Sequence, residues 1–249
     1  MAEAMHAPTT AAGAMAMPML RLEGVSSFYG RSHILHDVDL DVAAGEITAV
    51  LGRNGVGKTT LLKTIVGLVD RMTGRITLQG EDLSGRETFR RARAGIAYVP
   101  QGREIIPDFT IRENILMGAF ARAGGGREIP ALVPELFPYL IENLDRPGGV
   151  LSGGQQQQLA IARALAAAPK VLLLDEPTEG IQPNIVEEIE AQIVSLNRDH
   201  GITVILVEQN VAIARRTCHR FAMMEKGRIV AADAVDGLSD ELVHRHLSV

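Results

Sequence analysis

The chain has 249 residues, of which 46% are hydrophobic, so it can bury a sizeable core as one large domain or as one domain with an inserted lobe. Its net charge of -5 counts against a nucleic-acid binder that works through bulk charge, because phosphate backbones attract basic surfaces. The single cysteine, Cys218, excludes an intrachain disulfide and favours an intracellular compartment. We expect Cys218 to be a small buried side chain rather than a nucleophile.

Short apolar segments alternate with helical ones along most of the chain. Residues 1–18 are biased to Ala and Met, lack the features of a signal peptide, and predict a disordered tail. The later apolar runs are well short of the ~20 residues that a membrane-spanning helix needs. Strands are predicted, in chain order, at Leu20–Val25, Val38–Val42, Ile47–Leu51, Arg75–Leu78, Ile96–Val99, Val171–Leu174 and Ile202–Val207. Outside the middle of the chain, helices are predicted at Lys58–Val66, Ile185–Asn197, Val211–Arg216 and Leu238–Leu247, and a hairpin at Met223–Glu225 and Arg228–Ala231.

The pattern changes in the middle of the chain. From about 102 to 149 the strand signals stop, and helical segments at Ile111–Ala119 and Val133–Leu144 take their place. Another helix is predicted after Gly153-Gly154. We therefore expect a helical subdomain, approximately residues 102–165, inserted in a domain that covers 19–249. The alternation elsewhere predicts an α/β fold with a mostly parallel sheet covered on both faces.

A Gly-rich loop separates strand Ile47–Leu51 from helix Lys58–Val66. It fits G-x-x-x-x-G-K-[ST], a phosphate-binding pattern, in the strand–loop–helix context that the pattern requires. Glycines let backbone N–H groups cup phosphate oxygens, and the helix N-terminus adds positive potential. A lysine can then reach the β- and γ-phosphates of ATP, and a threonine hydroxyl can reach Mg²⁺. The alternative is a chance Gly-rich turn. Lys58 is also a catalytic candidate, and Thr59 is a candidate metal ligand. The candidate nucleotide-binding residues are Gly52, Arg53, Asn54, Gly55, Val56, Gly57, Lys58, Thr59 and Thr60.

Two carboxylates, Asp175 and Glu176, end the apolar strand Val171–Leu174. A buried strand delivers such residues to the sheet edge where a nucleotide binds. Asp175 is a candidate ligand of Mg²⁺, through water, and Glu176 is placed to polarise the attacking water as a general base. The alternative is a solvated strand end, which the phosphate loop upstream makes the poorer explanation.

The pentapeptide Leu-Ser-Gly-Gly-Gln at 151–155 lies directly before a helix and ahead of the acidic strand. With the loop and the acidic pair, it resembles the signature of the ABC ATPases, and the resemblance covers nearly the whole chain from about Leu20. It implies a P-loop NTPase core with a small antiparallel β part. In that family Ser152, Gly153, Gly154 and Gln155 would grip the γ-phosphate bound to the opposite subunit; the alternative is a glycine-mediated helix cap without a ligand.

Further positions match the family residue by residue. Tyr29 stands where an aromatic ring stacks on adenine, although a core tyrosine is the alternative. Gln101 stands where a glutamine reaches Mg²⁺ and water, and it leads into the helical lobe. Gln209 replaces the usual histidine, so it can hydrogen-bond a phosphate or water but carries no proton-linked charge. Gln182 replaces a usual aspartate, which leaves the communication across the dimer unsettled; an ATP-binding but slow subunit is the alternative.

With glutamine at Gln209 and Gln182, the chain resembles the second ATPase subunit of hydrophobic and branched-chain amino-acid importers. The segments 51–60, 99–105, 151–165 and 175–183 are more similar to the ATPase of the urea importer, so urea or a short-chain amide is the expectation and a branched-chain amino acid the alternative. The resemblance implies a head-to-tail dimer with a second ATPase subunit, different or identical. It also implies two integral membrane permease subunits, indirect contact with a periplasmic solute-binding protein, no nucleic acid, and a peripheral place on the cytoplasmic face of the inner membrane.

Two other classes compete with a transporter ATPase. Soluble ABC ATPases that act on DNA or ribosomes usually carry two ATPase domains, extended coiled coils or basic insertions, and the segment 102–149 lacks extended heptads. A regulatory ATP-binding module would usually have lost Lys58 or Glu176, or carry an appended domain, for which we expect no room after the hairpin.

Overall fold

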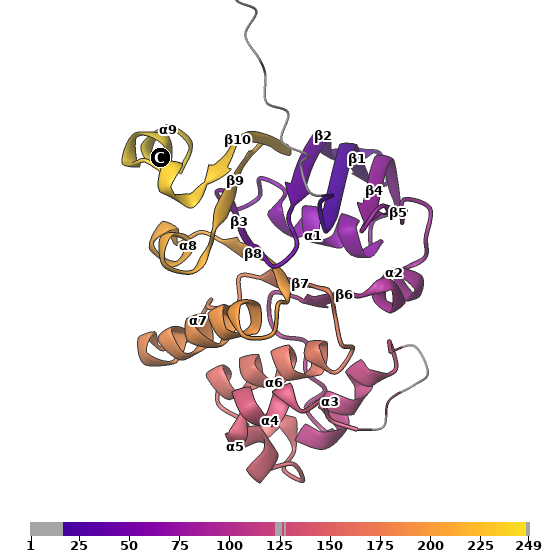
Figure 1. Cartoon of the computed structure of the whole chain (residues 1–249), viewed down its shortest axis with the longest axis vertical. Helices are drawn as coiled ribbons and strands as arrows, with labels where there is room; N and C mark the ends of the chain where they lie inside the picture. The colour runs from indigo at the N-terminus through magenta and orange to yellow at the C-terminus, as the bar shows by residue number, and fades with distance from the viewer. Residues whose placement is uncertain (1–16, 123–125, 127, 248–249) are drawn as a thin grey trace, which may run out of the picture.

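The computed structural model describes residues 17–122, 126 and 128–247. Two sheets and a group of helices are arranged along the long axis of the molecule (Figure 1). A four-stranded sheet lies toward the top of this view, a six-stranded sheet in the middle, and helices α3–α6 at the bottom. Of the predicted tail 1–18, only Met17 and Pro18 fall within the described residues.

The central sheet has the strand order β10-β9-β3-β8-β7-β6. All neighbours pair in parallel except β10, which joins β9 as an antiparallel edge and confirms the predicted hairpin. The predicted mostly parallel sheet is therefore confirmed. Its strands are β3 (Ile47–Leu51), β6 (Ile96–Val99), β7 (Val171–Asp175), β8 (Thr203–Glu208), β9 (Arg220–Glu225) and β10 (Arg228–Ala234).

Both faces of the central sheet are covered, as the continuous apolar strands predicted. Successive side chains of a strand point to opposite faces. Leu172 and Leu174 of β7 accordingly pack in one cluster with α6 (Gly153–Leu165), α7 (Pro183–Arg198) and α8 (Val211–Thr217). Val171 and Leu173 pack in a second cluster with α1 (Lys58–Val66) and the four-stranded sheet.

The four-stranded sheet is antiparallel with the order β2-β1-β4-β5. It consists of β1 (Leu20–Tyr29), β2 (Ser32–Val42), β4 (Arg71–Leu78) and β5 (Glu81–Asp82). The hairpin of β1 and β2 is longer than the predicted strands because the polar ends of both strands also pair, with irregular register between Leu22 and Phe28. This sheet is the antiparallel β part that the family resemblance implied.

No strand or helix was predicted between residues 79 and 95, where the structure has β5 and the helix α2 (Thr88–Ala94). A two-residue strand is too short to show a period, and α2 buries a charged residue instead of an apolar stripe. The guanidinium of Arg91, 3% exposed, donates to the carbonyl oxygens of Thr64, Ile65, Ser84 and Arg86. A helix that is anchored by a buried arginine carries no apolar stripe, so its sequence shows no helical periodicity of apolar residues.

The helices between β6 and β7 include α3 (Ile111–Ala119), α4 (Leu132–Leu136), α5 (Pro138–Glu142) and α6. α3 has the predicted bounds and begins with a capping box between Thr110 and Glu113. The single predicted helix Val133–Leu144 is wrong, because the chain breaks into α4 and α5 at Phe137, whose φ is -131 and ψ 60. Proline disfavours helical geometry in the preceding residue, and Pro138 acts on Phe137 in this way.

The backbones of α3 and α6 come close together at Gly118. A Cβ atom placed there would lie 1.8 Å from the carbonyl oxygen of Arg163 in α6. Gly118→Ala is therefore expected to push the two helices apart and lower the free energy of unfolding by about 1–3 kcal/mol. Urea titration checks this, with Gly85→Ala as the control because nothing lies within 4 Å of a Cβ atom there. Equal stability of the two variants would contradict the expected clash.

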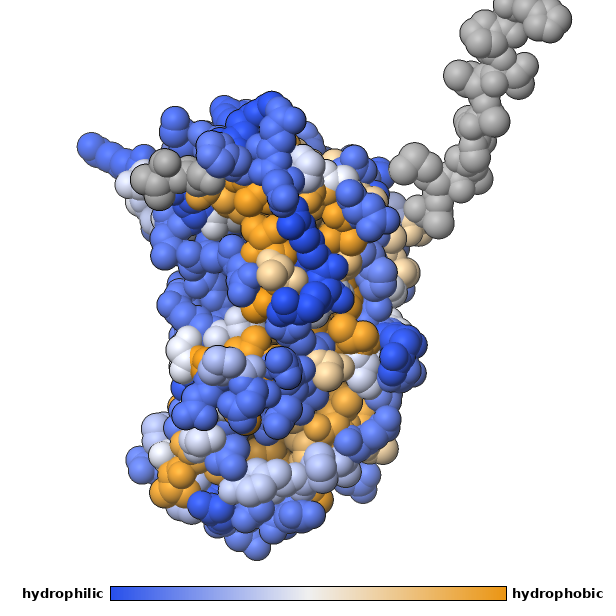
Figure 2. Space-filling view, turned by 90° about the vertical axis from the view of Figure 1, so that its left-hand side faces the viewer, coloured by the Kyte–Doolittle hydropathy of each residue, from blue (hydrophilic) through white to orange (hydrophobic). Residues whose placement is uncertain are grey.

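The C-terminal helix α9 (Asp240–Leu247) docks on the rest of the domain through Leu242, Val243 and Leu247, which pack against the cluster around α6–α8. On the face that lies on the left-hand side of Figure 1, polar residues dominate the surface and apolar residues form a broken band between them (Figure 2). None of the helices in the described residues is long and apolar enough to span a membrane.

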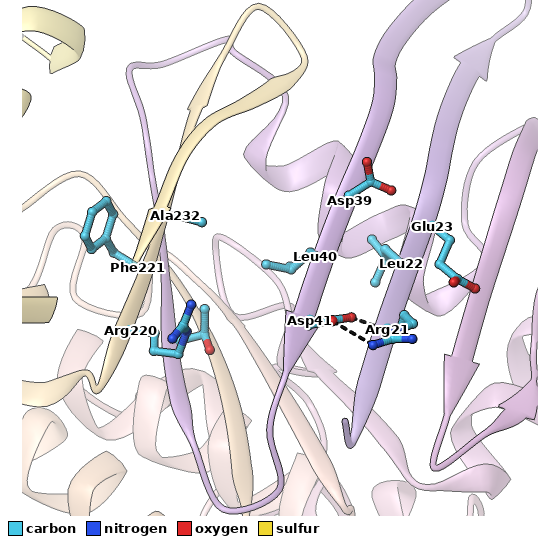
Figure 3. A pocket seen from close by; sticks show the side chains of 10 residues that line it. Arg21, Leu22, Glu23, Asp39, Leu40, Asp41, Arg220, Phe221 and Ala232 are labelled. Carbon is cyan, nitrogen blue, oxygen red and sulfur yellow. Dashed lines mark hydrogen bonds and ion pairs between the residues drawn. The ribbon is translucent and has the colours of Figure 1, made fainter. Parts of the chain in front are cut away.

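A hollow of about 300 Å³ lies between the two sheets (Figure 3). Arg21 and Asp41 face each other across β1 and β2 at its rim, with two hydrogen bonds of 2.7 and 2.9 Å. Arg220 of β9 lines the opposite side. None of the predicted site residues lines this hollow.

Candidate functional site

The predicted phosphate loop connects β3 to α1. Gly55 and Gly57 have φ values of +78 and +112, a region in which residues other than glycine are strained. Gly52 is required for a different reason, because a Cβ atom there would lie 2.7 Å from the carbonyl oxygen of Met224. The glycines of the motif thus set the backbone path that delivers Lys58 and Thr59 to the first turn of α1.

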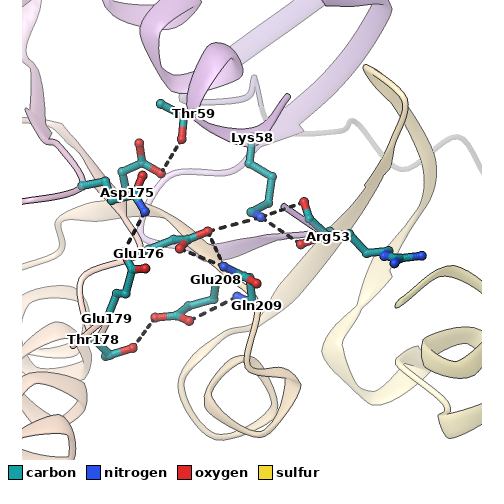
Figure 4. Close-up of polar contacts among 11 residues, drawn as sticks. Arg53, Lys58, Thr59, Asp175, Glu176, Thr178, Glu179, Glu208 and Gln209 are labelled. Atoms are coloured by element: carbon teal, nitrogen blue, oxygen red, sulfur yellow. Dashed lines mark hydrogen bonds and ion pairs between the residues drawn. The ribbon is translucent and has the colours of Figure 1, made fainter. Parts of the chain in front are cut away.

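Lys58 is 4% exposed and points back under the loop. Its Nζ donates to the carbonyl oxygens of Gly52 and Arg53 at 2.8 and 3.1 Å, and it lies 3.3 Å from Oε1 of Glu176 (Figure 4). A buried ammonium needs such partners, since an unpaired charge is costly to bury. The ion pair joins two residues that are far apart in the sequence and that were predicted to share one site.

Asp175 and Thr59 meet at the carboxyl end of β7. The hydroxyl of Thr59 donates to Oδ1 of Asp175 at 3.2 Å, and the hydroxyl of Tyr98 donates to Oδ2 at 3.1 Å. Asp175 is 1% exposed, and burial raises the pKa of its carboxyl group although both hydrogen bonds act to lower it. Burial and the nearby Asp175 charge raise the pKa of Tyr98 far above its usual range, so its hydroxyl stays a neutral donor.

The donors at this position fit Mg²⁺. No group of three or more His, Cys, Asp or Glu residues capable of holding a metal occurs within 17–122, 126 and 128–247. Mg²⁺ does not need one, because it is usually held by one or two protein oxygens together with substrate phosphates and water. The Thr59 hydroxyl and the Asp175 carboxylate supply hard oxygen atoms of that kind beside the phosphate loop.

Glu176 follows with a φ of +47, a strained conformation for a residue other than glycine. The amide nitrogen Nε2 of Gln209 donates to both of its carboxylate oxygens at 2.9 Å. Glu176 therefore lies between the lysine of the phosphate loop and the glutamine that follows β8 (Figure 4). The structure thus brings Gln209, predicted to hydrogen-bond a phosphate or water, into contact with Glu176, the predicted general base.

Glu208 and Thr178 support this arrangement, and neither was predicted as a site residue. Glu208 is 4% exposed, accepts from the Thr178 hydroxyl at 2.7 Å, and accepts from the backbone N–H of Gln209 at 3.2 Å. Burial raises the pKa of its carboxyl group. A charged residue at the end of the apolar strand β8 was the available signal, since buried carboxylates need partners.

The pentapeptide 151–155 begins α6, and its side chains cap that helix. Ser152 accepts from the backbone N–H of Gln155 at 3.4 Å, and the side chain of Gln155 accepts from the N–H of Ser152 at 3.0 Å. A Cβ atom on Gly154 would lie 2.4 Å from the side chain of Ile185, so α7 also requires this glycine. In the described part of the chain no hydrogen bond or ion pair joins these residues to Lys58 or Glu176.

The remaining predicted residues lie around this cluster. The side-chain amide of exposed Gln101 donates to Glu179 at 2.7 Å, just beyond the acidic pair. Half-buried Tyr29 ends β1 beside the hairpin turn, so it is not a core tyrosine. Gln182 occupies the N-cap position of α7, but its side chain makes no capping hydrogen bond there. Cys218 is buried, and burial raises the pKa of its thiol to about 12, as expected for an inert side chain.

A phosphate loop facing an acidic strand end on a mostly parallel sheet defines a P-loop nucleotide hydrolase. The model of the ABC transporter family matches residues 35–179, which is more than half of the chain. The chain therefore belongs to the ABC transporter family, as an ATP-hydrolysing subunit.

Curated relatives extend this likeness. The chain is 43% identical over 216 residues to the high-affinity branched-chain amino acid transport ATP-binding protein BraG of Pseudomonas aeruginosa, covering 86% of this chain and 92% of the relative. It is 37% identical over 227 residues to the probable branched-chain amino acid transport ATP-binding protein LivF of Archaeoglobus fulgidus, covering 90% and 94%. Both relatives are named for branched-chain amino acid transport and neither for urea transport.

Solved structures agree with the fold. The ADP conformation of an ATP-binding cassette of an ABC transporter has a TM-score of 0.77 and 28% identity, covering 94% of this chain and 96% of that one. A dimeric post-hydrolysis state of another cassette, bound to ADP and Pi, has a TM-score of 0.77 and 27% identity, covering 88% and 100%.

Proposed function

We propose that this chain is the ATP-hydrolysing subunit of an importer for branched-chain or similar hydrophobic amino acids. One observation carries the ATPase site: the phosphate-loop Lys58 and the strand-end Glu176 lie 3.3 Å apart in a cluster completed by Thr59, Asp175 and Gln209. The two relatives named for branched-chain amino acid transport support the solute class.

The contacts suggest a role for each side chain in the cluster. When ATP binds, Lys58 exchanges Glu176 and the loop carbonyls for the β- and γ-phosphates, which frees the Glu176 carboxylate to accept a proton from the attacking water. Gln209, which holds both carboxylate oxygens, orients this base. Thr59 and Asp175 would hold Mg²⁺, which would neutralise phosphate charge when bound.

The remaining predicted residues are assigned by resemblance. We propose that Tyr29 stacks on adenine and that Gln101 reaches the metal and its water after leaving Glu179. Ser152–Gln155 lies at a helix N-terminus, a favourable place for a phosphate. It would close on ATP held by a second ATPase subunit in a head-to-tail dimer, and the solved dimeric relative supports such an assembly for the fold.

The permease subunits would dock on a groove of about 370 Å³ between the core and the helical subdomain. Ile106 and Met117 line it, and both lie in the helical subdomain that was predicted at approximately 102–165. Leu68 and Met117, 50% and 42% exposed, leave apolar surface uncovered there. The chain would then lie on the cytoplasmic face of the inner membrane.

Two experiments test this proposal. Affinity purification from detergent-solubilised membranes should recover integral membrane subunits, and their absence would remove the transporter assignment. In the reconstituted complex, leucine-loaded binding protein should stimulate ATP hydrolysis and urea-loaded binding protein should not. Stimulation by urea alone would restore the urea importer.

Gln209→Ala is expected to slow ATP turnover roughly tenfold, because the base loses an orienting hydrogen bond but keeps its carboxylate. Steady-state hydrolysis at saturating ATP measures this loss. Gln192→Ala, which removes a glutamine whose amide donates to Leu136 in the helical subdomain, is the control. If Gln209→Ala loses as much activity as removal of the Glu176 carboxylate does, orientation alone does not explain the role of Gln209.

A further inference from the structure

Tyr98 is the residue of the site that neither the motifs nor the proposed roles explain. It lies on β6 opposite Leu173 of β7, three residues before Gln101. Residues 171, 173 and 175 share one face of β7, so the Tyr98 ring runs along that face toward the strand end. There its hydroxyl donates to Oδ2 of Asp175 at 3.1 Å.

This hydrogen bond leaves the opposite carboxylate oxygen available to the phosphate loop. Oδ1 of Asp175 accepts from Thr59, whereas Oδ2 is held by Tyr98. A carboxylate held at one oxygen loses rotational freedom, so its other oxygen is presented in a fixed direction. Removing the Tyr98 hydroxyl would also leave a carboxylate that is 1% exposed with one partner fewer.

The same side chain forms part of the groove between the core and the helical subdomain. Tyr98 lines that groove together with Ala92 of α2, Ala121 after α3 and Arg163 of α6. Its ring also packs against the apolar cluster around α1. One rigid side chain therefore has its ring at the groove and its hydroxyl on the buried carboxylate.

We propose that Tyr98 is a positioning residue: it fixes Asp175 for the metal of the nucleotide complex and transmits displacement of the groove wall to that carboxylate. A buried tyrosine hydroxyl usually finds a hydrogen-bond partner, and here the partner is the carboxylate whose other oxygen accepts from Thr59 of the phosphate loop. This inference rests on the proposed ATPase site, but it requires neither the permease subunits nor the amino-acid solute.

The test is the Mg²⁺ dependence of ADP binding by the full chain, which involves no turnover. Tyr98→Phe is expected to leave the affinity for ADP in EDTA unchanged and to raise the Mg²⁺ concentration for half-maximal tightening by roughly tenfold, the loss of one hydrogen bond to a buried charge. Tyr139→Phe is the matched control, because it removes an exposed hydroxyl that only accepts from Arg146 at 2.7 Å.

A Tyr98→Phe midpoint equal to that of wild type, or matched by Tyr139→Phe, overturns the positioning role. Wild-type chain that failed to bind ADP would instead contradict the proposed ATPase site, so the two failures are distinguishable. Weaker ADP binding by Tyr98→Phe in EDTA as well would show general damage to the site and would also overturn it.

Transmission from the groove is tested by a double-mutant cycle with Ala121→Trp, which adds bulk to the groove wall. This change is expected to shift the Mg²⁺ midpoint in the chain that has Tyr98 and to have a smaller effect when combined with Tyr98→Phe. No shift, or the same shift in both backgrounds, overturns the transmission.

Discussion

Replacing Glu176 with glutamine is expected to leave ATP binding at least as tight as in wild type and to lower turnover roughly a hundredfold to ten thousandfold. The amide has nearly the shape of the carboxylate but cannot accept a proton from water. It also removes the ion pair that Lys58 has to give up for phosphate. Nucleotide binding and single-turnover hydrolysis measure the two effects separately.

The same variant should accumulate as a closed dimer in ATP, because in the proposed head-to-tail dimer closure would precede hydrolysis and opening would follow it. Size-exclusion chromatography with and without ATP tests this expectation. Glu142→Gln is a matched control, since that carboxylate is exposed on α5 in the helical subdomain, outside the cluster around Lys58. Normal turnover by Glu176→Gln would exclude Glu176 as the general base.

The parts of the site that could be predicted are those formed by residues that are consecutive in the sequence. Gly52–Thr60 and Asp175-Glu176 can be recognised because a strand, a turn and a helix N-terminus fix their relative positions locally. The parallel order of β3, β8 and β7 then brings the two segments to the same edge of the sheet. The sequence could therefore place Lys58 and Glu176 in one site without any structure.

The side chains that support the site were not predictable in the same way. Tyr98 reaches Asp175 across 77 positions of sequence, and Thr178 reaches Glu208 across 30. Such contacts depend on the register between strands and on side-chain direction, which a single sequence does not encode in any short pattern. α2 was missed for a related reason, since its anchor is a buried arginine.

Lys58→Ala is expected to weaken ATP binding by roughly tenfold to a hundredfold or more, because the buried ammonium that we propose contacts two phosphates is lost. Turnover is then lost through binding, in contrast to Glu176→Gln, which keeps binding and loses chemistry. Equilibrium nucleotide titration checks the prediction, with Lys63→Ala in the last turn of α1 as the control. Unchanged ATP affinity would contradict the assigned role of Lys58.

Lys58→Ala should also destabilise the fold. This second effect distinguishes the role of Lys58 in the ion pair with Glu176 from its role in binding ATP. Glu176, whose side chain is 9% exposed, would lose its cationic partner and keep only Gln209, at a cost of about 1–3 kcal/mol in unfolding free energy. Adding Glu176→Gln removes the unpaired charge, so the double variant should regain most of that stability. It should not regain ATP binding, because the phosphates still lack Lys58. Recovery of both properties together would mean that Lys58 acts only as the partner of Glu176.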